Sequence, residues 1–126
     1  MDGAIGHRLW AIPEGYIPGS STGPEDMTSH ETACFLNTSD TDAQVDITVY
    51  FSDREPAGPY SVTVPARRTL HLWFNDLSEP EEIPRDTDYA TVIRSSVPIV
   101  VQHSRLDSRQ AENALLSTIA FPVSDA

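Results

Sequence analysis

The sequence predicts an all-β protein, an antiparallel β-sandwich or jelly-roll-like single domain of about eight strands over residues 1–126. The first observation is that apolar and polar residues alternate with a period of two in several short segments, the pattern of half-buried strands. The second is that proline, glycine and polar turn residues separate these segments at short intervals. No segment has helical periodicity for more than two turns. Strands of this kind pair into antiparallel sheets that bury one face.

Eight segments carry the strand pattern. The clearest is 45–51, where Val45, Ile47 and Val49 alternate with Asp46 and Thr48. The other seven predicted strands are 8–12, 30–37, 60–64, 69–75, 89–94, 99–106 and 114–121.

The N-terminal third has two of these strands with a long loop between them. In the first strand, Trp10 and Ile12 share one face, and in the second Cys34 shares a face with Thr32 and Leu36. Prolines and glycines punctuate the connecting segment 13–29. Its first half is expected to pack down, and its polar part, 19–28, is predicted to be mobile.

The central unit joins strand 45–51 to strand 60–64 through a turn rich in proline and glycine. In the next strand, Leu70 and Leu72 face the core, whereas His71, Trp73 and Asn75 point the other way. One face of this sheet is therefore expected to carry aromatic and hydrogen-bonding groups.

The C-terminal third begins with an acidic connection, 77–88. Strand 89–94 is expected to end at a turn over 95–98. In the strand that follows, Val101, His103 and Arg105 point one way and Gln102 points the other. A further strand, 114–121, precedes a flexible tail over 122–126.

Composition narrows the class of protein. Nineteen acids against eight arginines, with no lysine, give a net charge of −11, which argues against a general nucleic-acid binder. Arg67 and Arg68 still form a local basic pair. Cys34 is the only cysteine, so no internal disulfide can form, and a reduced cytoplasmic setting is expected. The chain has no apolar run of about 18 residues and no signal-peptide pattern at its start.

Catalytic and metal motifs are weak. His7, His30, His71 and His103 are scattered, without the short spacing of a zinc motif, and no metal or other cofactor is predicted. Cys34 lies in an apolar strand, the setting of an inert thiol. There is no G-x-S-x-G and no phosphate-binding glycine loop. Acids are so numerous that a catalytic carboxylate pair stays possible but unsupported, and we expect a protein that is not an enzyme.

A binding site is easier to assemble. Trp10, Tyr16 and Trp73 offer flat apolar surfaces for a small polar ligand. Hydrogen-bonding side chains lie near strand ends: His30, His71, Asn75, Gln102, His103, Arg67, Arg68 and Arg105. Surface ion pairing of the arginines, and packing of the tryptophans in the core or between subunits, remain alternative interpretations.

Six stretches resemble the sensory rhodopsin transducer family over nearly the whole chain. They are WAIPEGYIP (10–18), SHETACFLN (29–37), ITVYFSDREPAGPY (47–60), VPARRTLHLWFNDL (64–77), IPRDTDYATVI (83–93) and PIVVQHSRLDSRQAENALLSTIAF (98–121). The resemblance implies a cytoplasmic, homotetrameric all-β protein that binds the cytoplasmic face of a sensory rhodopsin and passes on its signal.

The same resemblance extends the set of candidate site residues. It adds Glu14 and Glu31, which stand in WAIPEGYIP and SHET, to Trp10, His30, Arg67, Arg68, His71, Asn75, Gln102, His103 and Arg105. Leu70 and Trp73 make RRTLHLWF more apolar than the basic stretch expected in the light-signalling member, which lowers the case for DNA contact.

Three functions are therefore open. The first is a non-enzymatic signal-transduction protein that relays the signal of a membrane photoreceptor. The second is a free-standing sensor of a small, sugar-like ligand. The third, a DNA-binding transcriptional regulator, is disfavoured by the net charge.

Overall fold

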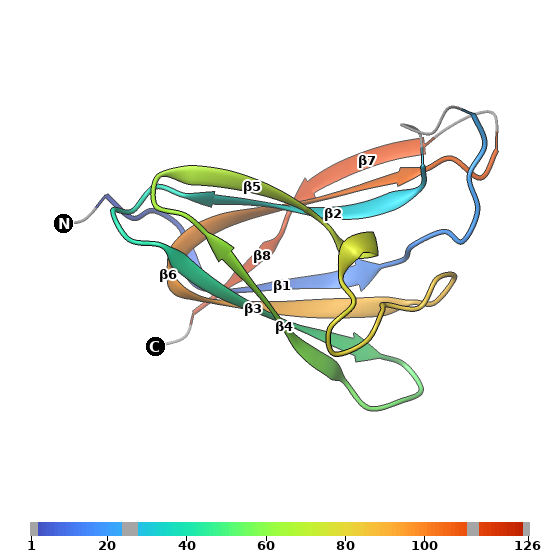
Figure 1. The fold of residues 1–126 in the computed structure, drawn as a ribbon, viewed down its shortest axis with the longest axis horizontal. Helices are drawn as coiled ribbons and strands as arrows, with labels where there is room; N and C mark the ends of the chain where they lie inside the picture. Colours follow the sequence, from blue (N-terminus) through green and yellow to red (C-terminus); the bar gives the residue numbers. More distant parts are fainter. Residues whose placement is uncertain (1–2, 24–27, 111–113, 125–126) are drawn as a thin grey trace.

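The computed structural model describes residues 3–23, 28–110 and 114–124, and over these it is nearly all β, as predicted (Figure 1). All strand pairings are antiparallel. The strands are β1 (His7–Gly15), β2 (His30–Asn37), β3 (Ala43–Phe51), β4 (Ala57–Val64), β5 (Arg68–Trp73), β6 (Tyr89–Asp107), β7 (Ala114–Ile119) and β8 (Phe121–Val123), and a short 3-10 helix η2 (Phe74–Asp76) follows β5.

Strand β6 holds the two layers of the fold together. Its first half pairs with β1 and β3, and its second half pairs with β2 and β7. One layer therefore has the order β4-β3-β6-β1-β8, and the other has β5-β2-β6-β7. Figure 1 shows β6 running along the lower layer, curving round one end of the molecule and returning along the upper layer.

The core lies between these layers. Val45, Ile47 and Val49 of β3 are fully buried, and Phe35 of β2 and Ile99 of β6 face them from other strands. Burial of each such side chain stabilises the fold by about 1.5–3 kcal/mol. The strict alternation of buried and exposed positions along β3 confirms the predicted period of two.

The predicted turn over 95–98 is wrong, because β6 continues through it. Tyr89, Thr91, Ile93 and Ser95 are buried, and the same odd-numbered alternation resumes with Ile99. The odd-numbered residues of β6 therefore point inward on both sides of its bend, and this one strand belongs to both layers.

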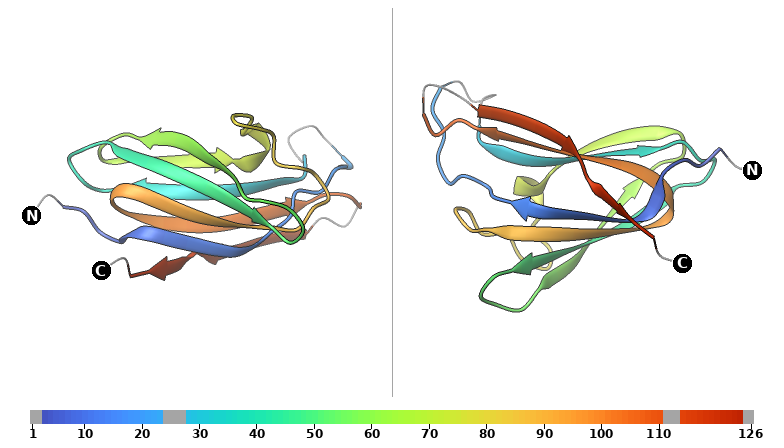
Figure 2. Two further views of the ribbon diagram at one scale, coloured as in Figure 1. Left: turned by 90° about the horizontal axis from the view of Figure 1, so that it is seen from below. Right: turned by 180° about the vertical axis from the view of Figure 1, so that it is seen from behind.

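The C-terminal segment also differs from expectation. The predicted strand 114–121 is two strands, β7 in one layer and β8 in the other, with buried Ala120 between them. Because β8 pairs with β1, residues 122 and 123 belong to a strand and not to a tail. Within the predicted mobile loop, residues 24–27 lie outside the described residues, while Thr22 N donates to Ser108 O over 2.6 Å. Both layers are seen from two further sides in Figure 2.

Among the residues described by the structure, no helix has the length and apolar character needed to cross a membrane.

Candidate functional site

A buried cluster of charged side chains occupies one end of the interlayer space. Glu31 of β2 pairs in register with Arg105 of β6, and Ala33 pairs with His103. Side chains of directly paired residues lie on the same face of a sheet. The alternation of each strand therefore turns Glu31, His103 and Arg105 inward together, next to the apolar core.

Glu31 is the centre of this cluster. Its side chain is fully buried, and its Oε2 lies 2.6 Å from Nε2 of His103. Its Oε1 accepts hydrogen bonds from Nε and Nη2 of Arg105, over 3.0 and 2.9 Å, and from the backbone N of Tyr16, over 2.5 Å. A buried carboxylate is tolerated only when paired and hydrogen-bonded in this way.

Arg105 links the buried carboxylate to a second one at the surface. Its Nη2 also donates to Glu14 of β1, whose side chain is 60% exposed. Burial acts to lower the pKa of Arg105, but hydrogen bonds and charge from Glu14 and Glu31 outweigh it and raise that pKa. The guanidinium is therefore a permanent positive charge between two carboxylates.

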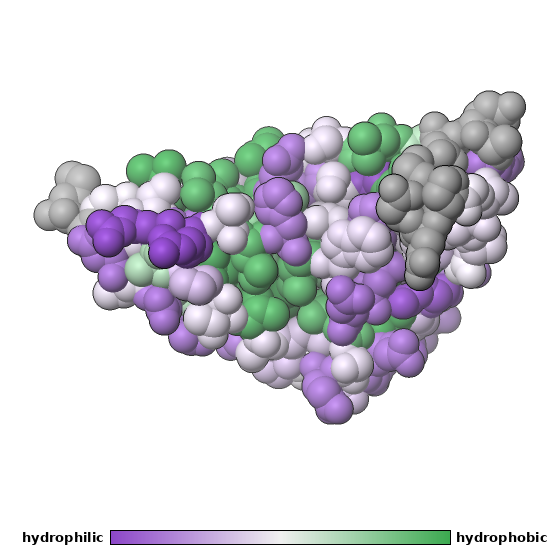
Figure 3. Space-filling view, turned by 45° about the horizontal axis from the view of Figure 1, so that its top comes forward, coloured by the Kyte–Doolittle hydropathy of each residue, from purple (hydrophilic) through white to green (hydrophobic). Residues whose placement is uncertain are grey.

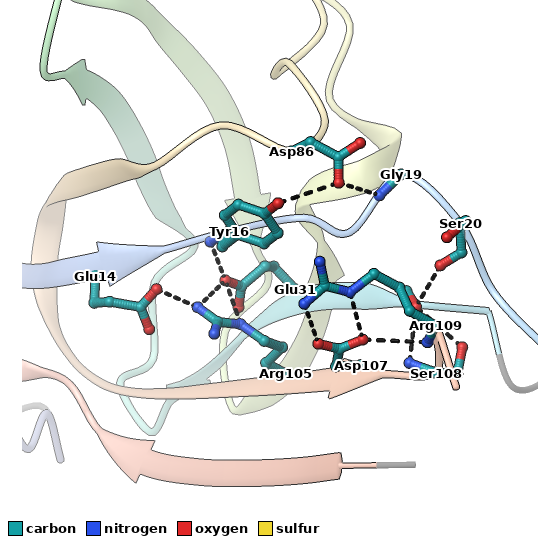
Figure 4. Close-up of polar contacts among 11 residues, drawn as sticks. Glu14, Tyr16, Gly19, Ser20, Glu31, Asp86, Arg105, Asp107, Ser108 and Arg109 are labelled. Atoms are coloured by element: carbon teal, nitrogen blue, oxygen red, sulfur yellow. Dashed lines mark hydrogen bonds and ion pairs between the residues drawn. The ribbon is translucent and has the colours of Figure 1, made fainter. Parts of the chain in front are cut away.

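The loop before β2 and helix η2 complete the surroundings. Asn75 accepts from the backbone N of Glu31 (3.3 Å) and donates to Ser29 O (3.0 Å). On the other side, the Tyr16 hydroxyl and the backbone N of Gly19 both donate to Asp86 (Figure 4). The segment after β1 is thereby held over the cluster.

Figure 4 also shows an ion pair next to this segment, between Asp107 and Arg109. The hydrogen bond from Arg109 lowers the pKa of Asp107. The Arg109 guanidinium lies 5.4 Å from the centre of the Tyr16 ring, a cation–π contact. Tyr16, which the sequence predicts as a flat surface for a ligand, thus lies beside the cluster, and so does Asp107, which the sequence does not single out.

A buried hydroxyl faces the same region. Tyr89 of β6 is 5% exposed, and its hydroxyl has no hydrogen-bond partner among the described residues. Burial first, and then the charge of Glu31, raise the pKa of this phenol. A Cβ on Gly15 would lie 2.4 Å from the Tyr89 ring, so the absence of a side chain at Gly15 makes room for the ring.

The remaining predicted residues do not join this cluster. His30 stacks on Trp73, with 3.8 Å between the ring centres, and its Nδ1 lies 2.8 Å from Thr28 O. Strand pairing places His71 and Gln102 on the same outer face, on either side of Cys34. Gln102 donates to Ser117 over 2.5 Å.

Two further groups lie elsewhere. Trp10 is buried in the core, where its indole N–H lies within hydrogen-bonding distance of the carbonyls of His7 and Ile99. Arg67 is exposed at the turn before β5 and lies 3.7 Å from Asp40, and Arg68 is exposed as the first residue of β5. The predicted set thus separates into the buried cluster, the outer face, the turn and the core.

An open pocket of about 290 Å³ adjoins the cluster at the edge of the sandwich. The sequence pattern does not reveal the walls of this pocket, because it predicts one strand over 114–121, whereas Leu116 and Phe121 belong to two strands, β7 and β8. The run of apolar residues in ALLSTIAF was the available signal. Among the described residues, no three His, Cys, Asp or Glu side chains converge as metal ligands. The cluster presents charged and hydrogen-bonding groups beside this pocket.

The model of the family described as Anabaena sensory rhodopsin transducer matches residues 5–122. The chain belongs to this family. The resemblance found in the sequence motifs is thus confirmed.

Two solved structures extend the family match. The structure named Anabaena sensory rhodopsin transducer is 62% identical to this chain, has a TM-score of 0.72, and the match covers 79% of this chain and 98% of that one. Thermotoga maritima 1070, known from a crystal structure, is 36% identical, with a TM-score of 0.85 and coverage of 94% and 96%. Among curated protein sequences, none matches this chain significantly. The chain thus has the fold of a transducer-type protein.

Proposed function

We propose that this protein is a non-enzymatic signal-transduction protein of the cytoplasm that binds the cytoplasmic face of a sensory rhodopsin and relays its light signal. The observation that carries this proposal is the 62% identity to Anabaena sensory rhodopsin transducer across 98% of that chain.

Charge complementarity supports a sensory rhodopsin as the binding partner. Loops of membrane proteins that face the cytoplasm carry an excess of lysine and arginine, and this chain has a net charge of −11 without any lysine. Opposite potentials speed encounter and fix orientation.

The strongest negative charge lies at one end of the sandwich. Residues 52–56 and 76–88 contain eight carboxylates and two arginines. An ion pair between Arg54 and Glu81 joins the two segments into one surface. A 2.7 Å hydrogen bond from the Tyr60 hydroxyl to Glu81 O holds the second segment against β4. Glu79 and Glu82 are exposed on it. We assign the rhodopsin contact to this surface, which we call the acidic end.

The outer face of the second layer supports a homotetramer. Strand pairing brings fourteen side chains together on it, none of them Asp, Glu, Arg or Lys: His30, Thr32, Cys34, Leu36, Thr69, His71, Trp73, Val100, Gln102, Ser104, Leu106, Leu115, Ser117 and Ile119. Depletion of charge is typical of interface cores. Because 21% of the residues in this chain are charged, a face of this size without charged side chains is expected where another subunit covers it. We call it the uncharged face.

The distribution of polarity over one side of the molecule agrees with this division. In Figure 3, hydrophobic residues gather in the middle and along the upper edge, and strongly hydrophilic residues gather toward the ends. The proposed apolar contact between subunits and the proposed electrostatic contact with a membrane partner therefore occupy different parts of the surface.

Titration calorimetry against a purified sensory rhodopsin in lipid nanodiscs tests the proposal. Wild-type protein is expected to bind, and binding is expected to weaken as salt screens the charges. The double variant Glu79→Lys, Glu82→Lys should bind at least about tenfold more weakly. The matched control, Asp40→Lys with Asp46→Lys, makes the same change in net charge on exposed positions away from the acidic end. No heat with wild type, or equal loss in both variants, would contradict the assignment.

A second candidate function is a free-standing small-molecule sensor, for which a sugar-like ligand was the expectation from sequence. The pocket beside Glu14 and His103 favours it. A ligand that raises the melting temperature while rhodopsin gives no binding heat would support the sensor over the transducer.

A further inference from the structure

The pocket at the edge of the sandwich has apolar walls. It lies where the chain crosses from β7 to β8 and leaves a gap beside β1. Ile12 and Pro13 line it from β1, and Leu116, Ile119 and Phe121 line it from the other side. The last three are 44%, 59% and 66% exposed. Such exposure of large apolar side chains around one cavity is typical of a binding site.

Apart from the Thr118 hydroxyl, which donates to Ile119 O over 3.5 Å, the polar side chains of the pocket offer hydrogen-bond acceptors. Glu14 lines it, and only one of its carboxylate oxygens, Oε2, is bonded to Arg105. The other, Oε1, has no partner within the described part of the chain. His103 lines the pocket too and is 3% exposed.

Glu31 decides which nitrogen of His103 accepts. The carboxylate of Glu31 can only accept, so the Nε2 that lies 2.6 Å from it must carry a proton. The neutral imidazole then has its lone pair on Nδ1. No residue in the described ranges bonds to Nδ1. Two residues that line the pocket thus each have an acceptor without a partner in the described ranges, His103 at Nδ1 and Glu14 at Oε1.

The net charge of the cluster determines which kind of hydrogen-bond donor on a ligand the pocket favours. Glu14 and Glu31 carry two negative charges and Arg105 one positive charge, so with neutral His103 the cluster has a net charge of −1. Desolvation in a small pocket strengthens attraction to a cation. A sugar, by contrast, presents hydroxyl groups on most sides and would leave many of them against apolar walls.

We propose that this pocket binds a small organic amine, with its ammonium group on Glu14 Oε1 and His103 Nδ1 and its compact apolar body against Ile12, Leu116 and Phe121. The inference rests on the small-molecule binding in the second candidate function and specifies its ligand class. The pocket volume of about 290 Å³ lies at the low end for ligand sites, which limits the ligand to a compact molecule.

Three probes of one shape test the charge requirement: phenethylamine, 2-phenylethanol and 3-phenylpropanoate. Binding is measured at mildly alkaline pH from backbone amide NMR shifts of the full chain. Phenethylamine is expected to shift the amides of residues 12, 103, 116 and 121. The alcohol should bind about tenfold more weakly or worse, and the acid should not bind. Equal affinity of all three probes, or shifts confined to other surfaces, would overturn the proposal, as would no shift with phenethylamine at millimolar concentration.

Two variants locate the contacts without endangering the fold, because both side chains are largely exposed. Glu14→Gln keeps the shape of the side chain and should weaken phenethylamine binding about tenfold or more. Phenethylamine should then bind this variant no more tightly than 2-phenylethanol does. Phe121→Ala should weaken the amine and the alcohol alike. The control Glu81→Gln neutralises another exposed, arginine-paired glutamate and should change affinity less than about twofold. A Glu14→Gln protein that binds phenethylamine like wild type would contradict the assignment.

The rhodopsin titration is a separate readout. Failure of the amine to bind, with rhodopsin binding intact, refutes the pocket alone. Amine binding without rhodopsin binding supports the pocket and refutes the transducer.

Discussion

The fully buried carboxylate of Glu31 lies 2.6 Å from Nε2 of His103, and the two residues are 72 positions apart in the chain. The pair joins β2 to the second half of β6 at the point where the apolar core gives way to charged groups. It fixes the His103 tautomer and, with Arg105, supports the pocket wall. Stability and the ligand binding that we propose therefore depend on the same carboxylate.

Glu31→Ala should destabilise the protein by about 3–5 kcal/mol, because it leaves the Arg105 charge and the His103 ring without their buried partner. Urea unfolding followed by circular dichroism measures this. Glu14→Ala is the control: it removes the exposed carboxylate on the same arginine and should cost about 1 kcal/mol or less. A loss below about 1 kcal/mol for Glu31→Ala would show that the cluster contributes little.

Tyr89→Phe should leave stability unchanged or raise it by up to about 1 kcal/mol. The Tyr89 hydroxyl is buried without a partner in the described structure, so its removal relieves a desolvation cost. The ring itself stays packed beside Gly15. Thermal unfolding of the two proteins is the comparison. A clear loss of stability would mean that the hydroxyl holds a buried water.

Ile119→Arg should dissociate the proposed tetramer, because it places a charge on the uncharged face, at an exposed position of its edge strand β7. Sedimentation velocity shows the change in mass. Leu9→Arg, a control on the outer side of the other layer, should leave the mass unchanged. If wild type is already a monomer, the assignment of this face to self-association is wrong.

The Cys34 thiol should react slowly with thiol reagents. Burial raises its pKa, which reduces the fraction of reactive thiolate, and a subunit covering the uncharged face would protect it further. The Ile119→Arg variant should therefore react faster than wild type at the same pH. Equal rates in both proteins would indicate that nothing covers Cys34.

Asp107→Asn should lower stability slightly at neutral pH and not at strongly acidic pH. Arg109 holds the folded-state pKa of Asp107 below its ordinary value, so the stabilisation is present above about pH 4 and is lost as the pH falls through the folded-state pKa. Unfolding curves of the two proteins should converge in acid. A difference that grows on acidification would have the wrong sign.

Local alternation was enough to predict most strands, because a half-buried strand shows its two faces in its own residues. The inward phase shared by Val101, His103 and Arg105 was also readable. Local alternation gave a wrong prediction at 95–98, where Ser95 and Pro98 are typical turn residues. There the long-range pairing of β6 with both layers overrides the local signal.

The site needed tertiary information. The residue pattern around Glu31 does not distinguish it from the eighteen other acids. The family resemblance singles it out together with Glu14, but only the pairing of β2 with β6 brings it to His103. Trp10 looked available as a binding surface, but burial of alternate β1 residues places it in the core. The pocket depends on the crossing from β7 to β8, which turns ordinary apolar strand residues into walls.

The central claim, that this protein couples to a light receptor, is tested most directly by flash photolysis of a sensory rhodopsin in nanodiscs with and without the protein. We expect the protein to change the rate at which the photocycle recovers, in proportion to the bound fraction, and the Glu79→Lys, Glu82→Lys variant to require a higher concentration for the same change. An unchanged photocycle at saturating protein would contradict the account.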